Sequence, residues 1–388
     1  MLDSVLARHG ETDPEPARPE PFFSRTTKIS LICYPYAPIL SGRGIDRYSY
    51  FLYESLKQMG VQAKIVGVPP SKHTLTRIAM AEPRLTWEIY RASGSLFHAV
   101  SPVGGGIAAL TGRRPLITSI HDVIPFFLRG YSPLKYAFLR FCIGISARAS
   151  DALIVPFEIT KRFLVHRFGI EPERVKVVSY GVDLTGFKPG TRRQGEERRI
   201  LFLGGGFPTI RGGNLLIRAF SQVSHEITHA QLLLAGTGPE IQPLKALVGK
   251  LGLRPRVRFI GFIKENELAQ YFRSVDVLVH PSRLGFSLSV LQAMACRTPV
   301  VVSDDLDLPE FVRDSGVVCR SGSSEGLSRA ILRVLADGGF AEFIAQKGYE
   351  RSKDFSLNRM IHETLQVYSE LADARDSGPQ PKPCSSTS

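Results

Sequence analysis

A glycine-rich loop between a predicted strand and a predicted helix is the first place in this chain where chemistry is expected. It runs from Leu203 to Asn214 and reads LGGGFPTIRGGN, with Gly205, Gly206, Arg211 and Gly212 among its residues. Where such a loop opens a helix, backbone N–H groups and the positive end of the helix dipole face a ligand, which suits a diphosphate. The Arg211 guanidinium can hold phosphate through two parallel hydrogen bonds. The alternative is a tight strand-to-helix turn with Arg211 in solvent.

A longer segment, from His280 to Asp304, reads HPSRLGFSLSVLQAMACRTPVVVSD. It resembles the signature segment of the retaining glycosyltransferases of family 4, also called group 1. The frame that carries the resemblance is Pro281-Ser282, Gly285-Phe286, Ala293-Met294-Ala295-Cys296 and Thr298-Pro299-Val300-Val301. The family has a glutamate before Gly-Phe and a second one eight positions later, where this chain has Leu284 and Gln292. The resemblance covers nearly all of the chain between its ends. It implies the GT-B fold, an α/β architecture of two Rossmann-like doubly wound domains facing across a cleft.

The resemblance also implies roles for residues of the second half. Arg211 stands where the family usually has a lysine, and it would stabilise the leaving diphosphate. The family's second glutamate accepts hydrogen bonds from ribose hydroxyls, and Gln292 can still accept one through its amide oxygen. Leu284 has no side-chain hydrogen bond to offer, so the sugar would meet the backbone N–H groups of Gly285, Phe286, Ser287 and Leu288 if this loop starts a helix. Phe262 and Ile263 would flank the base.

In the first half, the run SGRGIDRY from Ser41 resembles the family's other glycine loop, whose backbone approaches the donor phosphate and sugar. Gly44 matches the second glycine, and Arg43 replaces the first. Arg43 can add a phosphate contact or point into water. His121, in ITSIHDVIPFF, matches the family's histidine near the transferred sugar. A histidine there can donate to a sugar hydroxyl or sense acceptor deprotonation near neutral pH, and a packing role is the alternative.

The chemistry implied by this resemblance is transfer of a sugar from a nucleotide-sugar donor to a glycan or lipid-linked acceptor. The resemblance implies a retaining transfer that passes through an oxocarbenium-like state, in which the leaving diphosphate helps to deprotonate the acceptor. It needs no protein nucleophile, no metal and no other cofactor, because fixed positive groups around the departing phosphates lower the barrier. The alternative is a degenerate, non-catalytic GT-B protein that binds a nucleotide sugar or a glycan as a scaffold or regulator.

The elements that would position these residues alternate between strand-like and helical patterns. Apolar, strand-like runs recur along the chain and are separated by helical stretches such as Tyr48 to Met59 and Gly213 to Val223, which predicts parallel sheets. We expect a domain of residues 27–185 on the acceptor side and a domain of residues 186–356 on the nucleotide-sugar side. Residues 357–374 would form a helix that crosses back to the first domain. Residues 1–26 and 375–388 are polar and rich in proline, which predicts disordered tails.

Composition narrows the classes of partner. The 388 residues suit two domains, and 49 Lys and Arg against 36 Asp and Glu give a net charge of +13, which favours anionic partners. No nucleic-acid-binding pattern is found. The five cysteines have no zinc or dithiol spacing, and neither a signal peptide nor a membrane span is apparent. We therefore expect a cytoplasmic protein, either soluble or peripheral on the inner face of the cell membrane.

A possible membrane contact is the segment from Arg129 to Arg148, RGYSPLKYAFLRFCIGISAR. It mixes aromatic and aliphatic residues with spaced arginines and lysine, as an interfacial helix does. Arg162, Arg167 and Lys176 can extend that surface. A buried amphipathic helix with basic ends is the alternative.

Overall fold

The computed structural model describes residues 28–33, 44–67, 74–127, 133–191, 193, 195–205, 209–283, 287–305 and 308–376. By their contacts the residues form two units, and the second one is Tyr180–Arg359. The first unit takes in the chain up to Ser179 and resumes at Met360. The predicted tails lie outside the described residues, except that the last helix continues to Asp376.

The first unit contains a parallel sheet of six strands in the order β2-β1-β3-β4-β5-β6. Its strands are β1 (Lys28–Cys33), β2 (Gln62–Gly67), β3 (Leu96–Ala99), β4 (Leu116–Ser119), β5 (Ala152–Val155) and β6 (Val175–Val177). Its helices are α2 (Gly44–Gln58), α3 (Thr74–Arg91), α4 (Pro102–Leu110), α5 (Pro133–Ala149) and α6 (Glu158–Phe168), with short 3-10 turns η2 (Ile124–Phe126) and η3 (Pro172–Arg174). The last helix, α14 (Leu357–Asp376), contributes its residues from Met360 onward.

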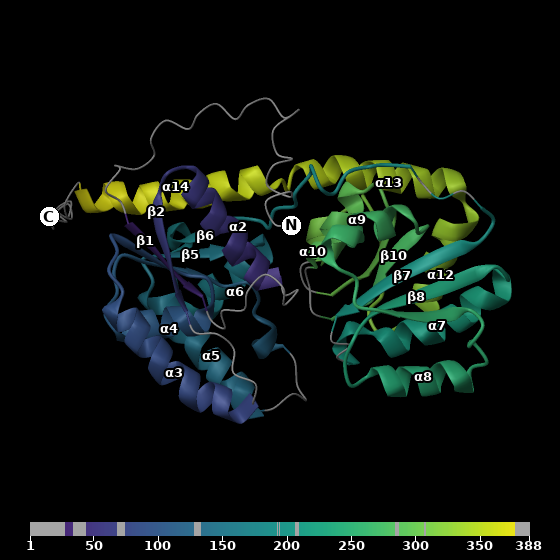
Figure 1. Cartoon of the computed structure of the whole chain (residues 1–388), viewed down its shortest axis with the longest axis horizontal. Helices are drawn as coiled ribbons and strands as arrows, with labels where there is room; N and C mark the ends of the chain where they lie inside the picture. Colours follow the sequence, from purple (N-terminus) through teal and green to yellow (C-terminus); the bar gives the residue numbers. More distant parts are fainter. Residues whose placement is uncertain are drawn as a thin grey trace, which may run out of the picture. The chain divides into compact units, whose positions relative to one another are not determined.

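Helices lie on both faces of this sheet (Figure 1). The central strands β3, β4 and β5 are buried at every position, as expected for parallel strands covered on both sides. On one face, Leu85 and Ile89 of α3 and Ala108 of α4 pack against Ile32 and Phe97 of the sheet. Because helices cover both faces of the sheet, a ligand would reach it at the strand ends.

The second unit repeats the plan with the strand order β12-β11-β10-β7-β8-β9. Its strands are β7 (Arg198–Gly205), β8 (Ala230–Gly236), β9 (Val257–Gly261), β10 (Val277–His280), β11 (Val300–Ser303) and β12 (Val317–Cys319). Its helices are α7 (Gly213–Glu226), α8 (Ile241–Lys250), α9 (Glu265–Arg273), α10 (Leu288–Ala295), α11 (Leu308–Val312), α12 (Ser324–Ala336) and α13 (Gly338–Lys353), and the 3-10 turn η4 (Thr209–Arg211) precedes α7.

One large apolar core fixes this second sheet. Phe202, Leu232 and Val279 of the strands pack with Phe220 of α7 and Ile331 of α12, all fully buried. The strand order changes direction between β7 and β10, since β7 pairs with β8 on one side and with β10 on the other. In doubly wound sheets, ligands bind outside the carboxyl ends of the strands at such a switch point. The loops after β7 and β10 are those of Arg211 and of the signature segment.

Candidate functional site

Arg211 is a cation without a counter-ion in the described part of the chain. It ends η4, directly before α7, and it is partly buried. Among the described residues its Nε has no hydrogen-bond partner, and no ion pair to Arg211 is found. Burial lowers the pKa of Arg211, but an arginine remains protonated in proteins. A buried charge without a partner is costly, so an anion that reaches this position would be stabilised.

Gly212 joins this turn to the signature segment. Its φ of 79° is left-handed, and a Cβ placed on it would lie 2.4 Å from the carbonyl oxygen of Pro281. Nearby, the N–H of Arg283 donates to the carbonyl of Ile210 at 3.0 Å. Only glycine combines that backbone conformation with that approach. The structure thus brings Arg211 beside the loop that enters the signature segment.

Gln292 lies in α10, and its side chain is only 2 % exposed. Its Nε2 donates to Oε1 of Glu265 at 3.0 Å. Its own Oε1 is buried and has no hydrogen-bond partner among the described residues. Glu265 stands in the first turn of α9 and was not predicted from the sequence to belong to the site. The one indication in the sequence was that Glu265 lies two residues after Ile263, which was expected to flank the base. Its place in a first helical turn was no indication, because acidic residues are common there.

The other residues predicted for the donor side differ in burial, and five of the predicted site residues lie outside the described part of the chain. Ser287 is the buried N-cap of α10, and Leu288 begins that helix. Gly205 ends β7 with a left-handed φ of 57° and open space around it. Phe262 is 57 % exposed, whereas Ile263 is 6 % exposed and belongs to the core, so Phe262 offers the more accessible side chain to a base. Outside the described residues lie Arg43, Gly206, Leu284, Gly285 and Phe286.

His121 lies in the first unit, directly after β4, and Gly44 begins α2 of the same unit. The His121 Nε2 is 2.8 Å from the carbonyl oxygen of Val100, so this nitrogen carries the proton and donates. Burial lowers the pKa of His121 to about 4. The ring is therefore neutral at neutral pH. This argues against the expected sensing of acceptor deprotonation, whereas hydrogen bonding to the transferred sugar stays a prediction, with packing as its alternative.

A buried hydrogen-bonded network, not predicted from the sequence, lies beside His121. His98 of β3 contacts the hydroxyl of Tyr368 in α14 at 2.6 Å through Nδ1, and Oγ of Ser119 at 2.8 Å through Nε2. Burial lowers the pKa of His98 to about 3, so this ring is neutral as well. Tyr48 of α2 packs edge-on against both His98 and His121, with ring centroids 6.5 and 5.2 Å away. The network ties α14 and α2 to the strand ends near His121.

The predicted interfacial helix is α5, of which residues from Pro133 are described. It buries Cys142, Ile143 and Ala147 and exposes Leu134 and Phe141. Its arginines are engaged inside the unit. Arg140 donates to the Pro125 carbonyl at 2.6 Å, and Arg148 lies over the ring of Phe168. Lys176 pairs with Glu370 at 2.6 Å. No helix in the described ranges is long and apolar enough to cross a bilayer.

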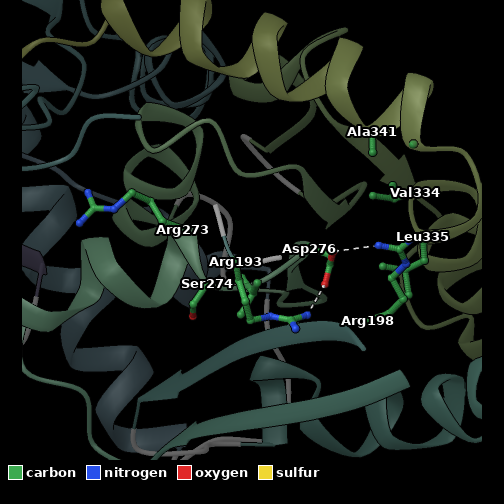
Figure 2. A pocket seen from close by; sticks show the side chains of 10 residues that line it. Arg193, Arg198, Arg273, Ser274, Asp276, Val334, Leu335 and Ala341 are labelled. Carbon is green, nitrogen blue, oxygen red and sulfur yellow. Dashed lines mark ion pairs between the residues drawn. The ribbon is translucent and has the colours of Figure 1, made fainter. Parts of the chain in front are cut away.

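A pocket of 130 Å³ in the second unit lies at the other end of the sheet, by the amino ends of β7 and β10. Figure 2 shows Arg193 and Arg198 pointing toward Asp276 and Arg273 pointing away from it. The two ion pairs measure 3.8 and 3.5 Å, and the Asp276 carboxylate also accepts the N–H of Arg199 at 2.7 Å. Because the Asp276 carboxylate contacts both arginines and a strand N–H, we interpret the side chains that line this pocket as structural contacts between the strand ends. Within the described residues, no group of three His, Cys, Asp or Glu side chains could hold a metal ion.

Comparisons with solved structures identify the fold. Sucrose-phosphate synthase from Thermosynechococcus elongatus superposes with a TM-score of 0.79 at 22 % identity, over 90 % of this chain and 100 % of that one. Anabaena HepE in complex with UDP and glucose superposes with a TM-score of 0.70 at 19 % identity, over 89 % of this chain and 100 % of that one. The fold is GT-B, as the sequence implied: two doubly wound units, each with a parallel six-stranded sheet.

The family follows from sequence matches. Residues 47–185 match the model of Glycosyltransferase Family 4, and residues 197–337 match that of Glycosyl transferases group 1. An uncharacterised glycosyltransferase of Methanocaldococcus jannaschii is 32 % identical over 88 % of this chain and 97 % of its own length. The chain therefore belongs to the glycosyltransferases, with a Family 4 domain in its first half and a group 1 domain in its second half, and its general activity is glycosyl transfer.

Proposed function

We propose that the protein transfers a sugar from a nucleotide-sugar donor to a glycan or lipid-linked acceptor, with retention of configuration at the anomeric carbon. The observation that carries the proposal is Arg211, a partly buried cation whose Nε has no partner among the described residues, at the start of α7. Guanidinium and a helix N-terminus both favour phosphate oxygens. The complex of HepE with UDP and glucose supports a donor of this class.

In the proposed reaction, the bond from the anomeric carbon to the leaving diphosphate breaks while charge builds on the phosphate oxygens. Arg211 and the positive end of α7 stabilise that charge, and one such fixed donor typically contributes on the order of 10²-fold in rate. The acceptor oxygen bonds to the same face of the anomeric carbon, and its proton passes to the departing diphosphate, so neither a protein nucleophile nor a metal is required. Neutral His121 contacts the transferred sugar by hydrogen bonding.

A panel of nucleoside diphosphates tests the donor class. Thermal shifts are measured with uridine, guanosine, adenosine and thymidine diphosphates and with their sugars, followed by slow hydrolysis of each sugar nucleotide. We expect one base to stabilise the protein most and its sugar nucleotide to be hydrolysed. A protein that binds none of them would contradict the proposal.

The second candidate is a non-catalytic scaffold that uses the same site. It is favoured by Leu284 and Gln292, which stand in place of the two family glutamates. Binding of a sugar nucleotide with no hydrolysis and no transfer would support this candidate over the enzyme.

A lipid-linked acceptor would place the protein at a membrane surface, and we include that location in the proposal because α5 exposes Leu134 and Phe141. Exposed apolar side chains of this kind insert at an interface. Flotation with liposomes, with and without anionic lipid, tests the location. Failure to recover the protein with either liposome would remove it.

A further inference from the structure

The amide of Gln292 and the carboxylate of Glu265 come together although they belong to different helices. Gln292 extends from α10, which follows β10, and Glu265 stands in the first turn of α9, which follows β9. The contact from Nε2 to Oε1 is 3.0 Å. In the first turn of α9 the acidic residues are Glu265 and Glu267, and Glu265 is the one that meets Gln292.

This contact fixes which way the amide points. An ionised carboxylate only accepts hydrogen bonds, so the nitrogen of Gln292 has to face Glu265 and the oxygen has to face the other way. That oxygen is buried and has no hydrogen-bond donor in the described ranges, and the Gln292 side chain is 2 % exposed. Buried acceptors are nearly always paired. A ligand with hydroxyl donors would supply the missing hydrogen bond.

Glu265 supplies the second acceptor. A carboxylate has about four lone-pair positions, so Glu265 can accept from a ligand hydroxyl at the same time as it accepts from Gln292. The side chain of Phe262, three residues before Glu265, is 57 % exposed. An apolar ring and a carboxylate thus lie close together in the chain directly after β9. They match a nucleoside, because the flat base can pack against the ring and the two adjacent ribose hydroxyls can donate to acceptors beside it.

We propose that Glu265 and Gln292 together form the ribose-binding pair of the donor nucleotide. The two neighbouring hydroxyls of the ribose donate to the Gln292 amide oxygen and to the Glu265 carboxylate. The carboxylate missing from position 292 is thereby supplied by α9, and the Gln292 amide holds it in place. This inference rests on the proposed nucleotide-sugar donor and names a residue that selects for it.

Calorimetric titration with uridine and guanosine diphosphates and with their 2′-deoxy and 3′-deoxy counterparts tests the pair. The wild-type protein is expected to prefer the ribonucleotide by roughly tenfold, the scale of one charge-assisted hydrogen bond. Glu265→Gln should lose most of this preference, while its affinity for inorganic pyrophosphate stays at the wild-type value. Glu267→Gln removes a charge from the same helical turn and should keep the preference.

The outcomes separate the two proposals. Equal ribose preference in Glu265→Gln and in the wild-type protein would overturn the ribose-binding pair and leave the donor class standing. A wild-type protein that binds neither diphosphate nor pyrophosphate would overturn the donor class, and the pair with it.

Discussion

Gly212 directly follows Arg211 and leaves no room for a Cβ beside the carbonyl oxygen of Pro281. In Gly212→Ala the added Cβ would lie 2.4 Å from that oxygen, at a left-handed φ of 79°. Gly252 is a matched control, because it has a similar φ of 68° and open space around it. We expect Gly252→Ala to cost about 1–2 kcal/mol of unfolding free energy from the backbone conformation alone. Gly212→Ala should cost clearly more and weaken diphosphate binding, as measured by urea unfolding and calorimetry. Equal losses in the two variants would contradict this.

At the scale of residues, the sequence predicted positions better than partners. Arg211 was expected at a strand-to-helix junction and lies there, because a glycine loop followed by a helical pattern is a local signal. The pairing of Gln292 with Glu265 joins residues 27 positions apart on separate helices, so it depends on how α9 and α10 pack. Phe262 and Ile263 were both expected to flank the base, and their contact with a base stays a prediction. The Phe262 side chain is exposed and the Ile263 side chain is buried in the core. Period and composition do not tell which of two neighbouring apolar residues turns inward.

Among the helices, α14 is attached to the sheet of the first unit through a polar contact. Tyr368→Phe removes the hydroxyl 2.6 Å from His98 and leaves a buried ring nitrogen without that partner. Loss of one partner in a buried pair costs about 1–3 kcal/mol. Urea unfolding should show this loss, and Tyr90→Phe, at a ring that is 56 % exposed, should change stability little. A Tyr368→Phe variant as stable as the wild-type protein would show that the contact does not hold α14.

The histidines at the ends of β3 and β4 predict that the unfolding free energy depends on pH. His98 and His121 have native pKa values of about 3 and about 4, both lowered chiefly by burial from an ordinary 6.5. The unfolded rings therefore bind protons below about pH 6.5 that the folded rings do not, so stability falls as the pH drops from 6.5 toward 4. Each ring contributes up to about 1.4 kcal/mol per pH unit in that window. Unfolding free energies at pH 7, 6 and 5 measure the slope, and equal values at all three would refute it.

The strands and their parallel alternation were predictable because buried β-rich runs between helical patterns are strong local signals. The strand-like runs form two parallel sheets, and the helical stretches expected at Tyr48 to Met59 and Gly213 to Val223 correspond to α2 and α7. Helix α3 was not predicted, and it contains Pro83, a residue that usually marks a helix end. The contact of His98 with Tyr368 spans 270 residues, which no local pattern can indicate.

Over the whole molecule, the two units differ in how they use the chain. The second is continuous, Tyr180–Arg359, whereas the first takes back the chain from Met360. A fragment of residues 180–359 should therefore unfold cooperatively on heating, followed by circular dichroism. A fragment of residues 1–179 lacks Tyr368 and the rest of α14, so it should melt without a cooperative transition. A sharp, reversible transition in the fragment of residues 1–179 would contradict this assignment of α14.

We expect the chain to be an enzyme because Arg211 and the positive end of α7 remain to stabilise the diphosphate, although Leu284 and Gln292 stand in place of both family glutamates. The most direct test is the rate of nucleoside diphosphate release from the preferred sugar nucleotide, compared between the wild-type protein, Arg211→Lys and Arg211→Ala. We predict measurable release by the wild-type protein, a smaller loss in Arg211→Lys, and a loss on the order of 10²-fold in Arg211→Ala. No release by the wild-type protein from any sugar nucleotide of the panel, or equal rates with and without the guanidinium, would contradict the account.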